Sequence, residues 1–313
     1  MIPVLSAQDW KERLFALSGA ESAGILAFYD HRLGAIACDS RCALAPLDDH
    51  LIHRGDGVFE YIRFSERRII DLDAHLTRLS RSAAGLELEP PCSWDEMRAI
   101  VIEVARASGR NEGALRILIG RGQGGFGVEP AECPQTSLYV AAHILRPVPE
   151  RLFEQGASAC RSQVPVKPAM LARLKTTNYL SSVLMSLEAA RCGADFSFSF
   201  DGDDCLAEAA VANVALVDVG GSLVMPEFHN ALPGTTARKA AKLAEQFMPV
   251  AWRCVPEAEL FTAREILLLG TAHECLGVVR YEDRVIGQGV PGPVALRLRA
   301  LLRRALLNEG VTF

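Results

Sequence analysis

Lys175 is the residue whose neighbours in the sequence most directly suggest chemistry. It stands between Leu174 and Thr176, just before an apolar run that favours a helix. A lysine buried where a core begins loses the solvation of its charge, so such a position asks for a reason. One reason is an amine kept neutral enough to attack a carbonyl group and form a Schiff base. Most lysines are solvated surface groups, so Lys175 needs support from other residues.

Two short loops could bind an anion near such a lysine. Pro233-Gly234-Thr235-Thr236 precedes a predicted helix, and Gly270-Thr271-Ala272 follows a predicted strand. Free backbone N–H groups and the helix dipole attract anions at a helix start, and threonine hydroxyls add donors. Ordinary helix capping explains most such threonines equally well. Together with Lys175, the loops suggest a phosphate-bearing cofactor held through a Schiff base.

Glu208 is a lone acid among apolar and small residues, in Leu206-Ala207-Glu208-Ala209-Ala210. A glutamate in such a segment is usually a surface position on a strand. If it is buried, its carboxylate needs a cationic partner, and a protonated pyridine nitrogen would be one.

Alternating strands and helices must position these residues. The patterns predict a helix over 8–18, a strand over 23–29, and a hairpin from 57–64 to 69–70. Helices follow at 73–86, capped by Asp73, and at 94–107, opened by Ser93. Further strands are predicted at 114–119, 137–143, 157–161, 195–200, 211–217 and 265–269. Further helices are predicted at 179–191, at 235–247 and from 293 onward.

Arg146-Pro147-Val148-Pro149-Glu150 predicts a linker, because two prolines favour an extended connection. We therefore expect a smaller N-terminal domain over residues 1–145, a linker over 146–152 and a larger domain over 153–313.

Composition limits the classes of function. The chain has 313 residues, of which 50% are hydrophobic and 23% charged, with a net charge of −5. This balance does not suggest a nucleic-acid partner. No apolar stretch approaches the ~20 residues of a membrane span. The nine cysteines contain no CxxC pair, which predicts reduced thiols, no metal site and a cytoplasmic location.

Gly120-Arg121-Gly122-Gln123-Gly124-Gly125 matches the spacing of a dinucleotide fingerprint. A dinucleotide site also needs a helix at once and an acidic residue about 20 positions later, and neither follows here. A glycine-rich active-site loop is the better interpretation. Arg121 is either part of the substrate end or a residue that braces this loop.

Taken together, these segments resemble the class IV, fold-type IV pyridoxal-phosphate enzymes, from about Asp48 to Leu302. That family includes branched-chain aminotransferases, D-amino acid transaminases and aminodeoxychorismate lyase. The matching segments stand in the family's order. They are Gly55-Asp56-Gly57-Val58-Phe59-Glu60, His75-Leu76-Thr77-Arg78-Leu79, Lys175-Thr176-Thr177-Asn178-Tyr179-Leu180, Ala207-Glu208-Ala209 with Asn213, Leu232-Pro233-Gly234-Thr235-Thr236, Gly270-Thr271-Ala272, and Ile286-Gly287-Gln288-Gly289 with Gly292-Pro293-Val294.

The resemblance implies a two-domain α+β fold with pyridoxal 5'-phosphate in the interdomain cleft. Lys175 would form the Schiff base and later move the proton, and Glu208 would pair with the pyridine nitrogen. The remaining cofactor-binding residues would be Arg78, Tyr179, Thr235, Thr236 and Thr271. The resemblance also implies a homodimer.

The substrate end departs from the family's patterns. The arginine and histidine that hold the substrate carboxylate in D-amino acid transaminases are absent from Gln123-Gly124-Gly125-Phe126. Arg63 and Arg116 match arginines near that end in branched-chain enzymes, and Phe59 and Ala272 would contact the substrate. Arg54 replaces a tyrosine and would bind a carboxylate in bidentate fashion.

Three functions are weighed on these residues. The leading one is a transaminase that moves an amino group from an amino acid to a 2-oxo acid. The alternative is a lyase of the aminodeoxychorismate type, which releases pyruvate and would suit an arginine-rich substrate end. The third is a non-catalytic cofactor binder, which the presence of both Lys175 and Glu208 disfavours. The sequence does not distinguish a D- from an L-amino acid donor.

Overall fold

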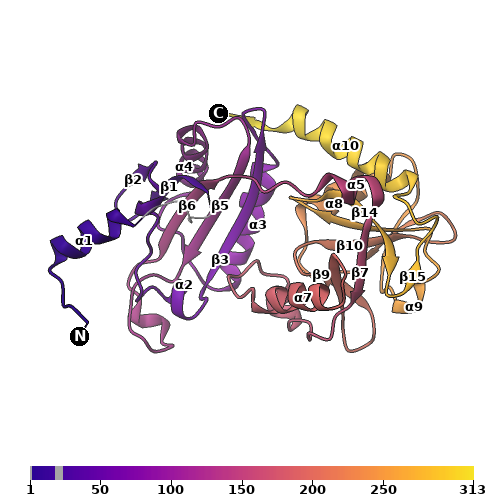
Figure 1. Ribbon diagram of the computed structural model, residues 1–313, viewed down its shortest axis with the longest axis horizontal. Coiled ribbons are helices and arrows are strands. Elements are labelled where there is room, and N and C mark those ends of the chain that lie inside the picture. Colours follow the sequence, from indigo (N-terminus) through magenta and orange to yellow (C-terminus); the bar gives the residue numbers. More distant parts are fainter. Residues whose placement is uncertain (1, 18–23) are drawn as a thin grey trace. The chain divides into compact units, whose positions relative to one another are not determined.

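The computed structural model describes residues 2–17 and 24–313 (Figure 1). The chain divides into two compact units. Unit 1 comprises Met1–Ile69, Glu87–Leu145 and Thr312–Phe313, and unit 2 comprises Ile70–Leu86 and Arg146–Val311. The division drawn from the linker places residues 70–86 in the first domain, whereas the structure places them in unit 2. That the two parts fold as independent domains stays a prediction.

Unit 1 is built on a seven-stranded sheet with the order β16-β4-β3-β5-β6-β1-β2. Its strands are β1 (Ile25–Asp30), β2 (Ala35–Ala37), β3 (Gly57–Ser65), β4 (Arg68–Ile69), β5 (Gly113–Gly120), β6 (Ser137–His143) and β16 (Val311–Thr312). Strands β3 and β5 pair antiparallel from Gly57 opposite Gly120 to Phe64 opposite Gly113. The predicted β3–β4 hairpin is confirmed.

The helices of unit 1 begin where polar side chains cap them. Helix α4 (Trp94–Ala107) starts with the predicted Ser93, whose side chain forms a capping box with Glu96. It packs on β1 and β6 (Figure 1). The shorter helices are α1 (Ala7–Ala16) and α2 (His50–His53), with 3-10 turns at Ser40–Cys42 and Pro130–Glu132. Residue 18 of the first predicted helix and residue 23 of the first predicted strand lie outside the described residues.

Unit 2 contains a nine-stranded sheet with the order β12-β11-β10-β13-β14-β7-β8-β9, and β15 pairs with β14. Strand β9 also pairs with β10, at Glu208 opposite Asn213, so six of the strands close into a ring. The strands are β7 (Ala157–Arg161), β8 (Phe196–Phe200), β9 (Leu206–Ala209), β10 (Asn213–Val217), β11 (Leu223–Pro226), β12 (Val250–Arg253), β13 (Glu265–Gly270), β14 (Glu274–Tyr281) and β15 (Arg284–Val285).

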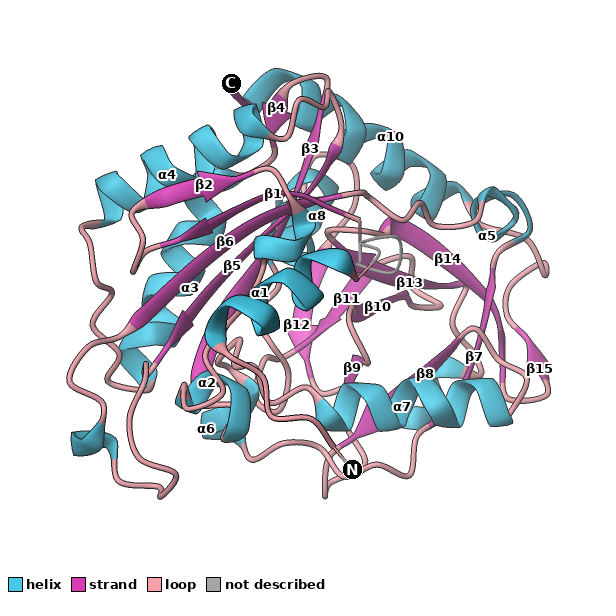
Figure 2. Cartoon of the chain, turned by 60° about the vertical axis from the view of Figure 1, so that its left-hand side comes forward, coloured by secondary structure: helices cyan, strands magenta, loops and turns pink. Residues whose placement is uncertain are grey.

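Helices cover this sheet around two apolar clusters. Helices α8 (Thr235–Ala244) and α10 (Pro293–Glu309) pack against each other and against β13, while α7 (Leu180–Arg191) lies along β8 (Figure 2). The others are α3 (Leu72–Gly85), α5 (Glu150–Gln155), α6 (Ala169–Ala172) and α9 (Glu257–Leu260). Asp73 is not the cap of α3. The N-cap is Asp71, which takes a left-handed conformation, and Asp73 lies in the first turn.

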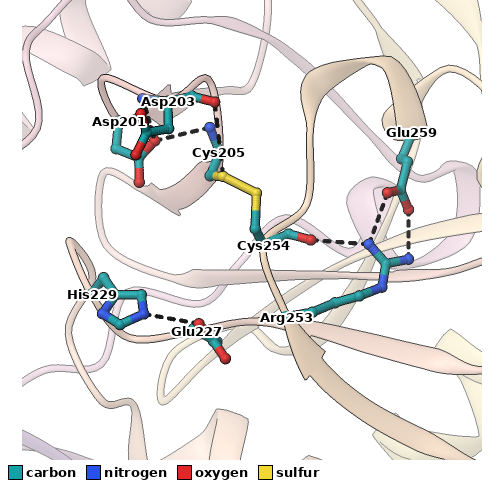
Figure 3. Close-up of a disulfide and its surroundings, with 8 residues drawn as sticks. All are labelled: Asp201, Asp203, Cys205, Glu227, His229, Arg253, Cys254 and Glu259. Atoms are coloured by element: carbon teal, nitrogen blue, oxygen red, sulfur yellow. Dashed lines mark hydrogen bonds and ion pairs between the residues drawn. A yellow bond between two sulfur atoms is a disulfide. The ribbon is translucent and has the colours of Figure 1, made fainter.

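The expectation that every cysteine is reduced is wrong. Cys205 and Cys254 form a disulfide with their Cα atoms 5.4 Å apart, within the range that the bond requires. Figure 3 shows the bond joining the segment before β9 to the residue after β12, with Arg253 paired to Glu259 beside it. No short-range motif announces this pair, because its members are 49 residues apart. The other seven cysteines are free thiols.

Candidate active site

A recess in unit 2 brings together most of the predicted cofactor residues. Its lining contains three basic side chains and one carboxylate, and all of its residues belong to unit 2. They are Arg78, Lys167, Ala172, Leu174, Lys175, Tyr179, Ser182, Glu208, Ala210, Val211, Ala212, Asn213, Leu232, Gly234, Thr235, Thr236, Leu269, Gly270 and Thr271. The placement of a cofactor between two domains stays a prediction.

Lys175 lies in the loop between α6 and α7, where both its backbone and its side chain are held. Its backbone N–H donates to Oγ of the buried Ser82 at 3.1 Å. Its Nζ donates to the Tyr179 hydroxyl at 2.9 Å and lies 5.3 Å from the centre of that ring. Leu174 fills the space beside Gly85, where an added Cβ would meet its Cδ2 at 2.6 Å. These contacts aim the amine into the recess.

Glu208 lies on β9, a strand that the sequence analysis missed between its predicted strands at 195–200 and 211–217. One carboxylate oxygen accepts a hydrogen bond from the backbone N–H of Leu232 at 3.0 Å. Burial raises the pKa of Glu208 to about 7, although that N–H group and the nearby cations Lys167, Lys175 and Arg78 oppose the rise. The site therefore holds a carboxylate that a further cation would stabilise.

The first turn of α8 faces the recess from another side. Gly234 is the N-cap of α8, and Thr235 and Thr236 are its first helical residues. A Cβ added at Gly234 would lie only 2.0 Å from Oδ1 of Asn213, so the close approach of the two segments requires glycine. Nδ2 of Asn213 in turn donates to the carbonyl of Leu232 at 2.8 Å. The helix start is thus fixed with its N–H groups toward the recess.

Arg78 and Thr271 complete the polar wall. Arg78 projects from α3, with Nη2 3.4 Å from Nδ1 of the buried His75. Nε2 of His75 lies 3.5 Å from Oγ1 of Thr235, so one imidazole bridges the arginine and the helix start. Thr271 opens the turn after β13 and lines the recess. Ala272 is the next residue of that turn and is not part of the lining.

Two residues of this site were missed from the sequence. Ser82 anchors the backbone of Lys175, and Lys167 adds a second lysine to the lining. A lysine between Val166 and Pro168, eight positions before Lys175, was the signal available for Lys167. Ser82 gives no signal, because a buried serine on a helix resembles many others.

Three of the predicted substrate residues share one face of the unit 1 sheet. Phe59 and Arg63 alternate along β3 with Tyr61, which pairs with Arg116 on β5. The guanidinium of Arg116 lies 5.4 Å from the centre of the Phe59 ring and 5.9 Å from that of Tyr61. Their roles toward a substrate stay predictions.

Arg54 and Arg121 both contact the chain near the glycine-rich loop. Nε of Arg54 donates to the carbonyl of Gly127 at 2.8 Å, and Nη2 donates to that of Phe126. Arg121 forms a two-pronged ion pair with Asp56, at 2.9 and 3.1 Å. Arg121 therefore fits the loop-bracing interpretation, and Arg54 performs a similar task in this structure.

Within the described ranges, no group of three or more histidine, cysteine, aspartate or glutamate residues could hold a metal ion. None of the helices in that part of the chain is long and apolar enough to cross a membrane.

Comparison with known proteins gives a consistent family. Residues 57–281 match the family described as amino-transferase class IV. The chain is 33% identical over 312 residues to a chloroplastic D-amino-acid transaminase of Arabidopsis thaliana, covering 96% of this chain and 81% of the relative. It is 30% identical over 276 residues to a putative branched-chain-amino-acid aminotransferase of Methanocaldococcus jannaschii, covering 87% and 95%.

Solved structures agree with the sequence relatives. A branched-chain amino acid aminotransferase from T.th. (HB-8) with pyridoxamine 5'-phosphate superposes with a TM-score of 0.85 at 29% identity, covering 91% of this chain and 95% of that one. The branched-chain enzyme of Escherichia coli gives 0.82 at 27% identity, covering 90% and 94%. The predicted α+β architecture of fold-type IV is confirmed by this agreement, and the chain belongs to the class IV aminotransferases.

Proposed function

We propose that the protein is a pyridoxal-phosphate-dependent transaminase that moves an amino group from an amino acid to a 2-oxo acid. The observation that carries this proposal is the placement of the Lys175 amine, the Glu208 carboxylate and the start of α8 around one recess. Relatives named as D-amino-acid and branched-chain aminotransferases support the reaction class.

The residues of the recess fit this cofactor in charge and in donor chemistry. A phosphate monoester carries nearly two negative charges at neutral pH. The lining offers Arg78, Lys167 and Lys175 against Glu208 as its carboxylate. Thr235, Thr236 and Thr271 add hydroxyl donors, and the start of α8 adds N–H groups. Glu208, whose pKa burial raises to about 7, would gain a cationic partner in a protonated pyridine nitrogen.

When bound, the cofactor supplies an electron sink for the carbanion that forms as an amino acid loses its α-proton. Lys175 would hold the cofactor covalently and, once released by the substrate amine, would take and return that proton at Nζ. Tyr179 holds this amine in reach through the 2.9 Å hydrogen bond. Glu208 would keep the positive charge opposite its carboxylate in place.

Elimination of pyruvate by an aminodeoxychorismate-type lyase is the weaker candidate. It would use the same lysine, but the relatives reported above are named as aminotransferases. At the substrate end we assign Arg63, Arg116 and Phe59 to the substrate's surroundings, because they share one face of the β3–β5 pair. Arg54 would contribute only after releasing its loop carbonyls.

The direct test is an absorption titration of the purified holoenzyme with D- and L-amino acids. We expect the band of the lysine-bound cofactor to convert to that of pyridoxamine phosphate with donors of one hand, and a 2-oxo acid to restore it. A band that no amino acid converts, together with pyruvate release from aminodeoxychorismate, would establish the lyase instead.

A homodimer is part of the proposal, and α7 supplies a surface for it. Leu180, Val183, Leu184 and Leu187 form one stripe of the helix and are 69%, 53%, 43% and 46% exposed. An apolar stripe of this kind is typical of a protein interface.

We expect Leu184→Glu to convert a dimer into a monomer at micromolar concentration in sedimentation velocity, because a charge would have to be buried in the interface. Leu296→Glu, at a 52% exposed position of α10, is the matched control and should leave the dimer intact. Identical sedimentation of both variants and wild type would remove α7 from the interface.

The proposed location is the cytoplasm. Seven free thiols support a reducing compartment, while the Cys205–Cys254 disulfide is unusual for one.

A further inference from the structure

Lys167 is a cation of the recess that has no task in the reaction described so far. It lies in the loop between β7 and α6, in the half-buried part of that loop. Its backbone carbonyl accepts a hydrogen bond from Nδ2 of Asn230 at 3.0 Å. This contact fixes the loop and keeps the side chain at the edge of the recess, where it joins the lining.

The ammonium of Lys167 rests on Tyr179, the residue that also holds the catalytic amine. Its Nζ lies 4.8 Å from the centre of the Tyr179 ring, within the range of a cation–π contact. Nζ of Lys175 lies 5.3 Å from the same centre. One aromatic ring therefore orients two lysines, of which only Lys175 also reaches the hydroxyl.

Lys167 and Glu208 attract each other across the recess. Burial lowers the pKa of the Lys167 ammonium, and the charge of Glu208 opposes that change. In the other direction, burial raises the pKa of Glu208, and among the cations that oppose the rise Lys167 has the largest effect, ahead of Lys175 and Arg78. In a partly desolvated site such an attraction is stronger than it would be in water.

The other cations that act on Glu208 have tasks of their own. Lys175 would change its charge state as it moves a proton, and Arg78 is held by His75 beside the start of α8. Lys167 has neither constraint, so it supplies a positive charge that stays constant through a reaction cycle.

We propose that Lys167 is a positioning residue that keeps Glu208 ionised, with the Tyr179 ring as its support. This inference deepens the proposed function and rests on it for the role of Glu208. The ionised carboxylate is the form that can hold a cationic partner, so a protonated Glu208 would lose its grip on that partner.

The test follows the protonation of Glu208 itself in the full-length protein freed of cofactor. The protonated carboxyl stretch of Glu208 is identified by infrared difference between wild type and Glu208→Gln and then followed against pH. Removing the charge with Lys167→Met should move the midpoint of Glu208 upward by about one pH unit. Lys167→Arg keeps the charge and should restore a midpoint close to wild type.

Lys242→Met is the matched control, since Lys242 is exposed on α8 and outside the recess. It should leave the midpoint unchanged. An unchanged midpoint in a folded Lys167→Met protein would overturn the proposal. If that variant does not fold, Lys167→Gln gives the same comparison, and an arginine variant that fails to restore the midpoint would also count against the proposal.

In the loaded enzyme, the acid limb of the kcat/KM profile should shift by the same amount in Lys167→Met, whereas a merely structural role would lower activity at every pH. The failure of this inference and that of the proposed function are separable. The infrared midpoint needs no substrate, whereas the proposed function fails if no amino acid converts the cofactor.

Discussion

Lys175→Ala is expected to reduce transamination by more than about 10³-fold, because it removes both the covalent attachment and the group that moves the proton. The side chain enters the recess and donates to Tyr179, and within the lining only Lys167 offers another lysine amine. The measurement is single-turnover conversion of the amino donor followed by cofactor absorbance.

Lys242→Ala is the control, because it removes an exposed lysine of α8 without touching the recess. Circular dichroism should report the same fold for both variants. Appreciable conversion by Lys175→Ala would rule out the assigned role and move attention to Lys167 as the attachment residue.

Glu208→Gln is expected to lower kcat by about 10²- to 10³-fold, because a neutral amide no longer stabilises positive charge opposite it. The same change should stabilise the cofactor-free protein at alkaline pH. Burial raises the pKa of Glu208 from 4.5 to about 7, so the folded protein binds its proton more tightly than the unfolded chain does.

The sign of the pH dependence follows from that difference. The stabilising contribution of protonated Glu208 is fully present below pH 4.5 and is lost as the pH rises through about 7. At pH 8 the wild-type apo-protein therefore bears the cost of a buried carboxylate, about 3 kcal/mol for this difference in pKa. The glutamine variant avoids that cost.

Urea unfolding of the apo-proteins at pH 5 and pH 8 measures this effect. The advantage of Glu208→Gln should grow between the two pH values, whereas Glu245→Gln, on the exposed end of α8, should follow wild type. A constant difference between the variant and wild type would mean that Glu208 does not titrate in this window.

Local patterns were sufficient to predict many elements. The capping box at Ser93 and the alternation in β3 depend on residues close in sequence, and both were predicted with nearly correct bounds. Strand β9 was missed because it has four residues and only one residue pair with β10, which offers little periodicity to detect. The cap of α3 was misplaced because Asp71 uses its backbone conformation and makes no side-chain hydrogen bond.

The site shows the same limit at longer range. Lys175, Arg78, Glu208 and the threonines were selected by resemblance, and the structure brings all of them to one recess. Ser82 and Lys167 matter only through contacts across the fold, with the backbone of Lys175 and with Glu208. The carbonyl contacts of Arg54 were likewise invisible in a sequence that suggested a substrate carboxylate.

The Cys205–Cys254 bond turns part of the chain into a covalent ring. The ring encloses Glu208, Asn213, Thr235 and Thr236, and excludes Lys175, Arg78 and Thr271. A protease that cuts once inside the ring, for example in the exposed segment near His229, severs a peptide bond without separating the polypeptide into two pieces. The carboxylate and the helix start would remain tethered to each other, so a nicked molecule keeps both halves of its anion-binding wall until a thiol reductant opens the bond.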